Sequence, residues 1–369
     1  MRFEKPIFVT VPSLAPLSEV DAYLAGVWES GVMTHNGPLV QRFERDFAEW
    51  SGLPRLAAVA NGTLAIQLAL RALDLPPGSE IITTPFTFIA TLSSIIYEGF
   101  KPVFADIDPD TFNIDPSKIE AAVTPRTAAI LPVHVFGNPC DVQAIENIAR
   151  RRGLKVVYDA AHAVGAEIGG KSALAWGDAS ATSFHATKLL NTAEGGGVHA
   201  ADERIDGRLR ELRFFGYDDR KTVVRTGTNA KMTEVNAAIG LANLKHLDEV
   251  LADRHRKYAL YRDIMSSSGA VSFQKVSAGC NHSYFPVVFR SESALLHVDA
   301  ALRCANVFAR RYFWPSVNKC AAIVPDAPKC PASESLAERI LCLPLYSSLP
   351  EESIRVIAEI VVKALKELE

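Results

Sequence analysis

Short runs of continuously apolar residues, separated by helical patterns, constrain the fold of this chain more than any other feature. The apolar runs cover residues 56–60, 80–84, 102–106, 127–135 and 155–158. The segments between them, such as 63–73 and 141–152, place apolar residues at helical spacing. Strands that are apolar on both faces are typical of parallel sheets covered by helices. The sequence therefore predicts an α/β fold with a mostly parallel sheet.

Helical patterns also flank this region of the chain. They cover residues 18–28, 38–50, 232–265 and 350–368. Ser18 is expected to cap the first helix, and Pro38 is expected to begin the second. The pattern over 232–265 predicts one long helix that bridges two domains.

The character of the sequence changes after Gly195, where helices and a strand at 284–289 are expected. The length of 369 residues is enough for more than one domain. We therefore predict a large α/β domain over residues 1–245, which includes an N-terminal helical segment. A smaller C-terminal α+β domain is predicted over residues 246–369.

Charge and cysteine content exclude two classes of protein. The 39 Lys and Arg residues and 42 Asp and Glu residues give a net charge of −3, so we expect no nucleic-acid binding. The six cysteines lack Cys-x-x-Cys spacing and we expect no signal peptide, which favours reduced thiols in a cytoplasmic protein. The uncharged stretch 81–97 is too short to span a membrane and is expected in the core.

One motif matches a nucleotide-binding pattern without the structural context that the pattern needs. Gly165 to Ser172 fits the P-loop pattern G-x-x-x-x-G-K-S letter for letter. A P-loop requires a helix directly after it, whose N-terminus holds the phosphates. A turn at Gly177-Asp178 leaves no room for that helix. A glycine-rich hairpin is therefore favoured, and a nucleoside triphosphatase ranks last among the candidate functions.

Two segments place polar groups where predicted strands end. Asn61-Gly62-Thr63 lies between a strand and a helix, where backbone N–H groups can face an anion. Asp159 closes the apolar run 155–158 and would ordinarily face a cation or a helix cap. Its functional interpretation is a carboxylate that keeps a pyridinium nitrogen protonated. His162 fits a structural or a functional role equally well on this pattern alone.

A third segment, Ser183-Phe-His-Ala-Thr-Lys188, is followed by the glycine-rich Glu194-Gly-Gly-Gly197. Lys188 could simply be solvated, but a partly buried lysine can lose its proton and form a Schiff base with an aldehyde. Lys188 lies 29 residues after Asp159, which allows the two to follow adjacent strands joined through a hairpin.

Taken together, these motifs resemble the DegT-type sugar-nucleotide aminotransferases, a family of fold-type I pyridoxal phosphate (PLP) enzymes. The similarity runs through nearly the whole chain. Besides the three segments above, it covers residues 36–38, 85–88, 132–137 and 227–229. The pair Asp159-Ala-Ala-His162 and Ser183-Phe-His-Ala-Thr-Lys188 is its most specific part. The resemblance implies a fold-type I PLP-dependent transferase.

The resemblance also implies a role for each matching residue. Lys188 forms a Schiff base with pyridoxal 5'-phosphate and moves the proton between cofactor and substrate. Asp159 pairs with the pyridine nitrogen, Phe88 stacks on the ring, and His162 lies beside the phenolic oxygen. The groups implied to hold the phosphate are Gly62, Thr63 and Ser183, together with Asn229 from the other subunit of a homodimer. No metal site is expected.

The segment around Glu194 is similar to the branch of the family that aminates C-4 of the sugar. This favours transfer from L-glutamate to dTDP-4-dehydro-6-deoxyglucose, which gives dTDP-4-amino-4,6-dideoxyglucose. The alternatives are a transaminase that acts at C-3 or on a GDP- or UDP-linked ketosugar, and a non-catalytic regulator with the same fold. A sugar dehydratase is disfavoured, because those relatives carry His in place of Lys188.

The chain departs from many relatives after Asn229, where Ala230 and Lys231 replace an aromatic residue and Arg. Whether Lys231 keeps a substrate contact of that Arg is therefore open. The cations considered for binding a diphosphate are Arg213, Lys221, Arg225 and Lys231, and each of them could equally be solvated.

Overall fold

A central sheet of mostly parallel strands organises the computed structural model, which describes residues 2–266 and 269–368. The strand order is β2-β10-β9-β6-β5-β3-β4. The bounds are Ala57–Val59 (β2), Glu80–Thr83 (β3), Lys101–Phe104 (β4), Thr127–Leu131 (β5), Lys155–Asp159 (β6), Ala179–Ser183 (β9) and Gly196–Ala200 (β10). β10 runs antiparallel to β2 and β9, and the other neighbours pair in parallel. The predicted α/β class is confirmed.

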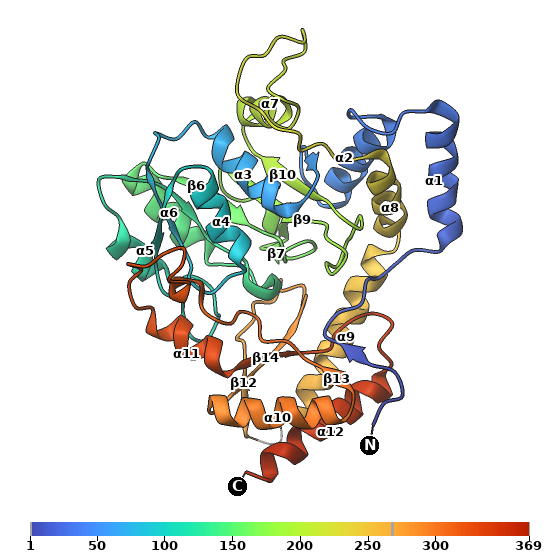
Figure 1. Ribbon diagram of the computed structural model, residues 1–369, viewed down its shortest axis with the longest axis vertical. Helices are drawn as coiled ribbons and strands as arrows, with labels where there is room; N and C mark the ends of the chain where they lie inside the picture. The colour runs from blue at the N-terminus through green and yellow to red at the C-terminus, as the bar shows by residue number, and fades with distance from the viewer. Residues whose placement is uncertain (1, 267–268, 369) are drawn as a thin grey trace.

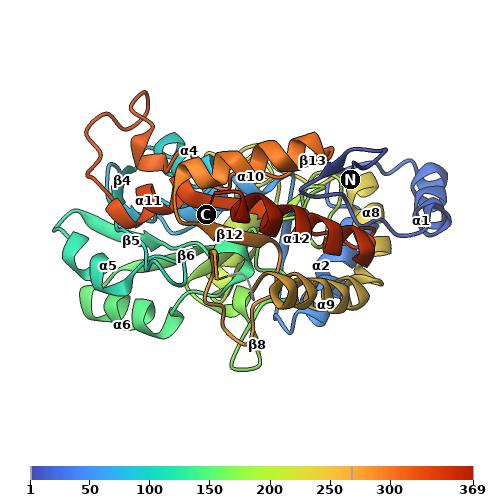
Figure 2. The ribbon, with the colours of Figure 1, turned by 90° about the horizontal axis from the view of Figure 1, so that it is seen from below.

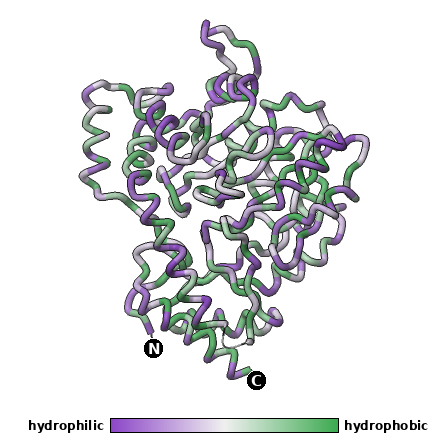
Figure 3. Tube along the Cα trace, turned by 180° about the vertical axis from the view of Figure 1, so that it is seen from behind, coloured by the Kyte–Doolittle hydropathy of each residue, from purple (hydrophilic) through white to green (hydrophobic). Residues whose placement is uncertain are grey.

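Helices cover both faces of this sheet. Figure 2 shows the strands between α4 (Ile89–Tyr97) on one side and α5 (Pro116–Ala122) with α6 (Val142–Arg152) on the other. Adjacent residues of β3 separate onto the two faces: Ile81 packs with α3 (Gly62–Ala72), and Ile82 packs with α6. Both side chains are fully buried, which explains the continuous apolar runs. Along the trace in Figure 3, hydrophobic and hydrophilic stretches alternate.

Three helices, α1 (Leu17–Ser30), α2 (Pro38–Trp50) and α8 (Glu234–Leu244), flank the β2 side of the sheet (Figure 1). Pro38 begins α2 as predicted. The prediction that Ser18 caps α1 is wrong, because the helix already begins at Leu17 and its cap position is Pro16. Phe43 and Phe47 of α2 both meet Phe184 edge-on at a centroid distance of 5.2 Å. This packing anchors the segment that leads from β9 to Lys188.

The predicted single helix over 232–265 is also wrong. The structure has two helices, α8 and α9 (Leu247–Ser266), with a break between them. At the break, Lys245 and His246 both reach the Glu19 carboxylate of α1, with N···O distances of 3.1 and 2.8 Å. Neither Gly nor Pro stands at the break, which coincides instead with these contacts to α1; the local sequence pattern does not reveal them.

The part of the chain from α9 onward, called the C-terminal half below, builds a second hydrophobic cluster, which Ile7 near the start of the chain joins. Its antiparallel sheet has the order β11-β12-β14. The bounds are Val271–Phe273 (β11), Phe285–Phe289 (β12), Ile340–Leu343 (β14), Glu292–Cys304 (α10), Pro331–Arg339 (α11) and Glu351–Lys366 (α12). The strand β1 (Ile7–Phe8) pairs with β13 (Val307–Phe308), so the start of the chain lies with this half. The domain division at residue 245 stays a prediction.

The glycine-rich segment that fits the P-loop pattern forms a hairpin of β7 (Glu167–Ile168) and β8 (Lys171–Ser172). A 3-10 turn at Ala173–Ala175 follows it in place of a helix. The rejection of the P-loop is confirmed. This hairpin lies between β6 and β9 in the sequence, and those two strands are parallel neighbours in the sheet.

The remaining predictions concern cysteines and membrane segments. The six cysteines are free thiols. The uncharged stretch 81–97 covers residues 81–83 of β3, a loop and α4; most of it is buried as predicted, but Phe88, Ile96 and Tyr97 are exposed. Among the described residues, no helix is long and apolar enough to cross a membrane. The charged loop 218–225, which lies beyond α7 (Glu203–Leu212), belongs to the part of the chain that projects from the body at the top of Figure 1.

Candidate active site

A cavity of about 280 Å³ lies where the loops leave the carboxyl ends of β2, β3, β6 and β9. Residues from widely separated parts of the sequence meet there. Those predicted from the sequence that line it are Gly62, Thr63, Phe88, Asp159, His162, Ser183 and Lys188. Asn229 does not line this cavity; it is exposed next to Lys231, whose amine donates to its side-chain oxygen.

The N-terminus of α3 forms one end of the cavity. Asn61 caps the helix, because its side-chain oxygen accepts a hydrogen bond from the Leu64 N–H at 2.9 Å. A Cβ atom added to Gly62 would lie only 2.7 Å from the Cβ of Ser183. Glycine therefore lets the helix start approach the end of β9. The positive end of the helix, Thr63 and the Ser183 hydroxyl together suit a phosphate group.

A buried carboxylate stands at the end of β6. Asp159 is 5% exposed. Its carboxylate accepts hydrogen bonds from the Thr91 hydroxyl at 2.7 Å and from the Ala161 N–H at 3.1 Å. Burial raises the pKa of Asp159, while both hydrogen bonds and the positive charge of Lys188 oppose that shift. A cationic ring nitrogen beside it would favour the ionised carboxylate further.

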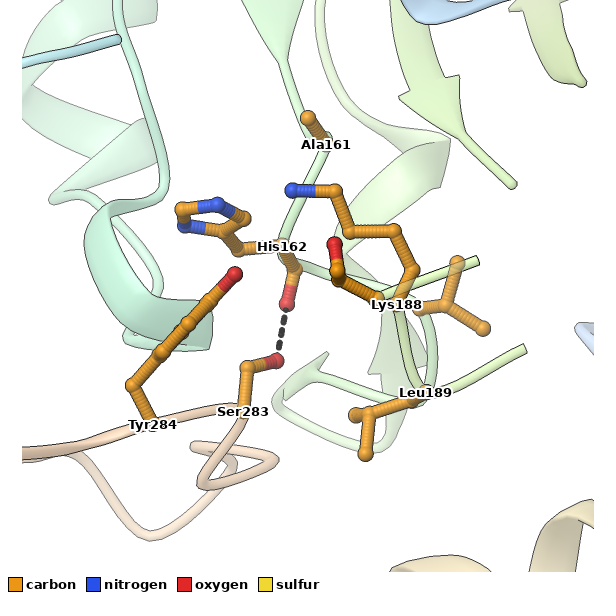
Figure 4. Close-up of a pocket in the computed structure, with 8 residues that line it drawn as sticks. Ala161, His162, Lys188, Leu189, Ser283 and Tyr284 are labelled. Carbon is orange, nitrogen blue, oxygen red and sulfur yellow. Dashed lines mark hydrogen bonds between the residues drawn. The ribbon is translucent and has the colours of Figure 1, made fainter. Parts of the chain in front are cut away.

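Lys188 lies in the loop that joins β9 to β10. In Figure 4 its amine points toward Ala161 and His162. Burial lowers the pKa of the Lys188 amine to about 8, and the nearby Asp159 carboxylate opposes this shift. A larger fraction of the amine is therefore neutral near pH 7 than for a solvated lysine, and a neutral amine can attack an aldehyde.

His162 is enclosed by aromatic side chains. Its ring lies nearly parallel to the rings of Phe136 and Phe313, and its centroid is 4.9 Å from that of Tyr284. Burial, reinforced by the charge of Lys188, keeps the pKa of His162 well below its ordinary value. The imidazole is therefore neutral at pH 7. Within the described residues its buried Nδ1 atom has no hydrogen-bond partner.

Phe88 stands at the cap position of α4 and is 52% exposed although it is aromatic. Its neighbour Phe86 is fully buried in a cluster of aromatic rings. An exposed aromatic side chain on a cavity wall offers a flat surface to a planar ligand.

The C-terminal half supplies a wall that the sequence motifs did not reveal. Tyr284, Arg310, Tyr312 and Phe313 line the cavity together with the predicted residues. A link between the two halves is visible in Figure 4: the Ser283 hydroxyl donates to the His162 carbonyl oxygen at 2.7 Å. The side-chain amide of Asn281 donates to the same oxygen at 2.6 Å. The sequence offered one signal, the clustering of cationic and aromatic side chains at 310–313.

The cations considered for a diphosphate lie elsewhere. Arg213 is only 4% exposed, forms an ion pair with Glu44 and donates to the Ala58 carbonyl, so its role is structural. Arg225 pairs with Glu211. The Lys231 amine lies over the rings of two phenylalanines, and Lys221 is exposed. None of these four described residues lines the cavity.

The residues present fit pyridoxal phosphate at each of its functional groups. Lys188 offers an amine for the aldehyde, and Asp159 offers a buried carboxylate for the ring nitrogen. Phe88 offers an aromatic face, and the close approach of Gly62 to Ser183 at the start of α3 suits the phosphate.

Comparison with known proteins agrees with this chemistry. The model of the DegT/DnrJ/EryC1/StrS aminotransferase family matches residues 17–362. The dTDP-4-amino-4,6-dideoxy-D-glucose transaminase of Shigella dysenteriae is 41% identical over 99% of this chain and 100% of its own. The protein of that name from Escherichia coli is 37% identical over 95% of this chain and 96% of its own.

Solved structures agree as well. DesI, solved in the presence of its TDP-sugar product, has a TM-score of 0.94 and 34% identity over 99% of this chain and 95% of its own. NtdA from Bacillus subtilis, solved with bound cofactor PMP, has a TM-score of 0.88 and 29% identity over 95% and 82% of the two chains. The chain belongs to the DegT/DnrJ/EryC1/StrS aminotransferase family and is a pyridoxal phosphate-dependent sugar-nucleotide transaminase.

Proposed function

We propose that this enzyme transfers an amino group from L-glutamate to C-4 of dTDP-4-dehydro-6-deoxyglucose and so produces dTDP-4-amino-4,6-dideoxyglucose. The observation that carries the transaminase chemistry is the meeting of Lys188 and the buried Asp159 in one cavity. The choice of sugar is supported by the two relatives named for this product and by the sequence around Glu194.

The chain's own residues divide the work as follows. When bound, pyridoxal phosphate supplies an electron sink for negative charge at the substrate carbon. Lys188 holds the cofactor and moves a proton to and from that carbon. Asp159 holds a proton at the ring nitrogen, and Thr91 keeps its carboxylate in place. The neutral His162 can share a hydrogen bond with an oxygen without adding charge.

Amination at C-3, or of a GDP- or UDP-linked sugar, is the alternative within the same reaction class. A panel of dTDP-, GDP- and UDP-linked 3- and 4-ketosugars, incubated with enzyme and L-glutamate, separates these reactions. NMR of the products should show an amine at C-4 of the dTDP-linked 6-deoxyhexose. Amination of a 3-ketosugar alone would contradict the proposal.

The assignment of Lys188 can be tested by chemical trapping. Borohydride reduction of the holoenzyme should leave the cofactor attached to the peptide that contains Lys188. Replacement by alanine should lower transamination by several orders of magnitude, because neither the covalent attachment nor the proton transfer remains. Lys171→Ala, at the exposed start of β8, is the matched control and should keep full activity. A label on another lysine would refute the assignment.

The assignment of Asp159 can be tested with an isosteric variant. Asp159→Asn keeps an oxygen for the Thr91 hydroxyl but loses the charge that holds a proton on the ring nitrogen. The variant should bind the cofactor, as followed by its visible absorbance, and turn over far more slowly than the wild type. Asp178→Asn, at the start of β9, removes a carboxylate outside the cavity and should leave turnover per folded enzyme unchanged. Near-normal turnover of Asp159→Asn would give the role to another group.

We also propose that the enzyme is a homodimer with shared active sites. Asn229 matches the family's phosphate-binding asparagine, yet in its own subunit it is exposed and outside the cavity. It follows the charged loop 218–225 in the part of the chain that projects from the body (Figure 1). In the proposed dimer, Asn229 of one subunit serves the cavity of the other. A symmetric dimer makes such an exchange reciprocal.

Subunit mixing tests this arrangement. Lys188→Ala and Asn229→Ala homodimers should both be impaired, because each site lacks one essential group. A mixed dimer combines both lesions in one site and leaves the other site intact, so partial activity should return. Exchange of subunits without recovery, or activity of a strict monomer, would exclude the shared site.

A cytoplasmic location is proposed on separate grounds. The six cysteines are free thiols, and four of them are buried within the described core. Free thiols of this kind are typical of proteins in a reducing compartment.

A further inference from the structure

The wall that the C-terminal half contributes to the cavity carries one guanidinium group, that of Arg310. Its side chain is exposed to the cavity rather than packed into the fold. Among the described residues, the Arg310 side chain has neither an ion-pair partner within 4.0 Å nor a hydrogen bond. Its charge is therefore not balanced within this chain.

The backbone of Arg310 is nevertheless firmly held. Its N–H donates to the Cys342 carbonyl at 3.1 Å, and the Cys342 N–H donates to the Arg310 carbonyl at 2.8 Å. Cys342 belongs to β14 and is fully buried. The guanidinium carbon lies 4.7 Å from the centre of the Tyr312 ring, which also lines the cavity. The fold thus places this charge at the cavity instead of leaving it on a mobile surface.

Arg311, the next residue along the chain, has a structural role instead. Arg311 pairs with Glu292 at 2.8 Å and donates to the carbonyl oxygen of Glu338 at 3.1 Å. Its guanidinium also lies over the Trp314 ring, and it does not line the cavity. The charge of Arg311 is thus neutralised by an ion pair, whereas Arg310 faces the cavity without one.

The other titratable groups of the cavity do not balance Arg310 either. The charges of Asp159 and Lys188 offset each other, and His162 is neutral. Glu194 also lines the cavity, but among the described residues it forms no ion pair with Arg310; its carboxylate lies 3.6 Å from the imidazole of His185. When a bound substrate displaces water from the cavity, the guanidinium needs an anionic partner, since a desolvated charge without a partner is strongly unfavourable.

We propose that Arg310 binds an oxyanion of the substrate, either a carboxylate of the amino donor or a phosphate of the nucleotide sugar. This inference rests on the proposed function, because both substrates of that reaction are anions that must enter this cavity. The planar guanidinium can donate two parallel N–H···O hydrogen bonds to either group. Arg310 is therefore a substrate-binding residue on the wall built by the C-terminal half.

The two halves of the reaction distinguish the two sources of the oxyanion. Stopped-flow absorbance follows the reaction of the holoenzyme with L-glutamate and, separately, of the aminated enzyme with dTDP-4-dehydro-6-deoxyglucose. Arg310→Gln should raise the concentration for half-maximal rate about tenfold or more in at least one of these reactions, as expected for a lost charge-assisted pair. Its limiting rate should change less. Arg310→Lys keeps the charge without the planar donor pair. Its half-maximal concentration should therefore lie between those of the wild type and Arg310→Gln.

Each outcome of this experiment has a definite meaning. An effect on glutamate alone assigns the carboxylate, an effect on the sugar nucleotide alone assigns the phosphate, and an effect on both assigns a shared anion site. Arg311→Gln is the matched control and should leave both half-maximal concentrations unchanged when rates are expressed per folded enzyme. Changes below twofold in both reactions, or equal changes in Arg311→Gln, would overturn the proposal.

Failure of the proposed function is distinguishable from failure of this inference. If the wild-type enzyme reacts with neither substrate, the proposed function is wrong. Calorimetric titration of the holoenzyme with dTDP and with glutarate still tests the anion site. Weaker binding of either probe to Arg310→Gln, but not to Arg311→Gln, supports the role of Arg310. Equal affinities of the wild type and Arg310→Gln for both probes contradict it.

Discussion

A carboxylate buried at the end of β6 is the constraint on which the rest of the site depends. Removing an ionised group such as Asp159 from water is costly unless hydrogen bonds and an opposite charge compensate for it. The Thr91 hydroxyl, the Ala161 N–H and the charge of Lys188 provide that compensation here. These groups come from three separate segments, which the strand ends and α4 must hold together. The position of Asp159 therefore ties the local chemistry to the sheet topology.

The single antiparallel strand of the described sheet has a clear consequence for the position of Lys188. If the strand after β9 were parallel to it, the chain would first have to cross back to the amino ends of the strands. The antiparallel β10 instead follows directly through the loop 184–195. That loop consequently stays at the carboxyl ends of β6 and β9, next to Asp159. Phe184 at its start packs against α2, and the side-chain amide of Asn243 holds the Asn191 carbonyl at 2.9 Å. Both ends of the lysine loop are thereby fixed.

The sequence predicted what depends on local pattern and missed what depends on distant contacts. Apolar runs and motifs identified the sheet and the residues that gather at its strand ends, because each signal lies within one short segment. The break between α8 and α9 accompanies side-chain contacts with Glu19, and the burial of Arg213 follows from Glu44. Both partners lie more than one hundred and fifty residues away in the sequence. The cationic and aromatic cluster at 310–313 was the only local sign of the wall, and the fold was needed to place Arg310 at the cavity.

The cavity thus combines two sets of residues with different structural origins. The residues that fit the cofactor come from strand ends of the large sheet, where a small displacement would disturb the buried Asp159. The cavity wall that carries Arg310 comes from the C-terminal half, and the Arg310 backbone is hydrogen-bonded to β14. Asn281 and Ser283 fix that half to the site by binding the His162 carbonyl. Side chains on the wall can therefore differ in charge and shape while the groups around Lys188 keep their positions, which separates substrate selection from the chemistry common to the family.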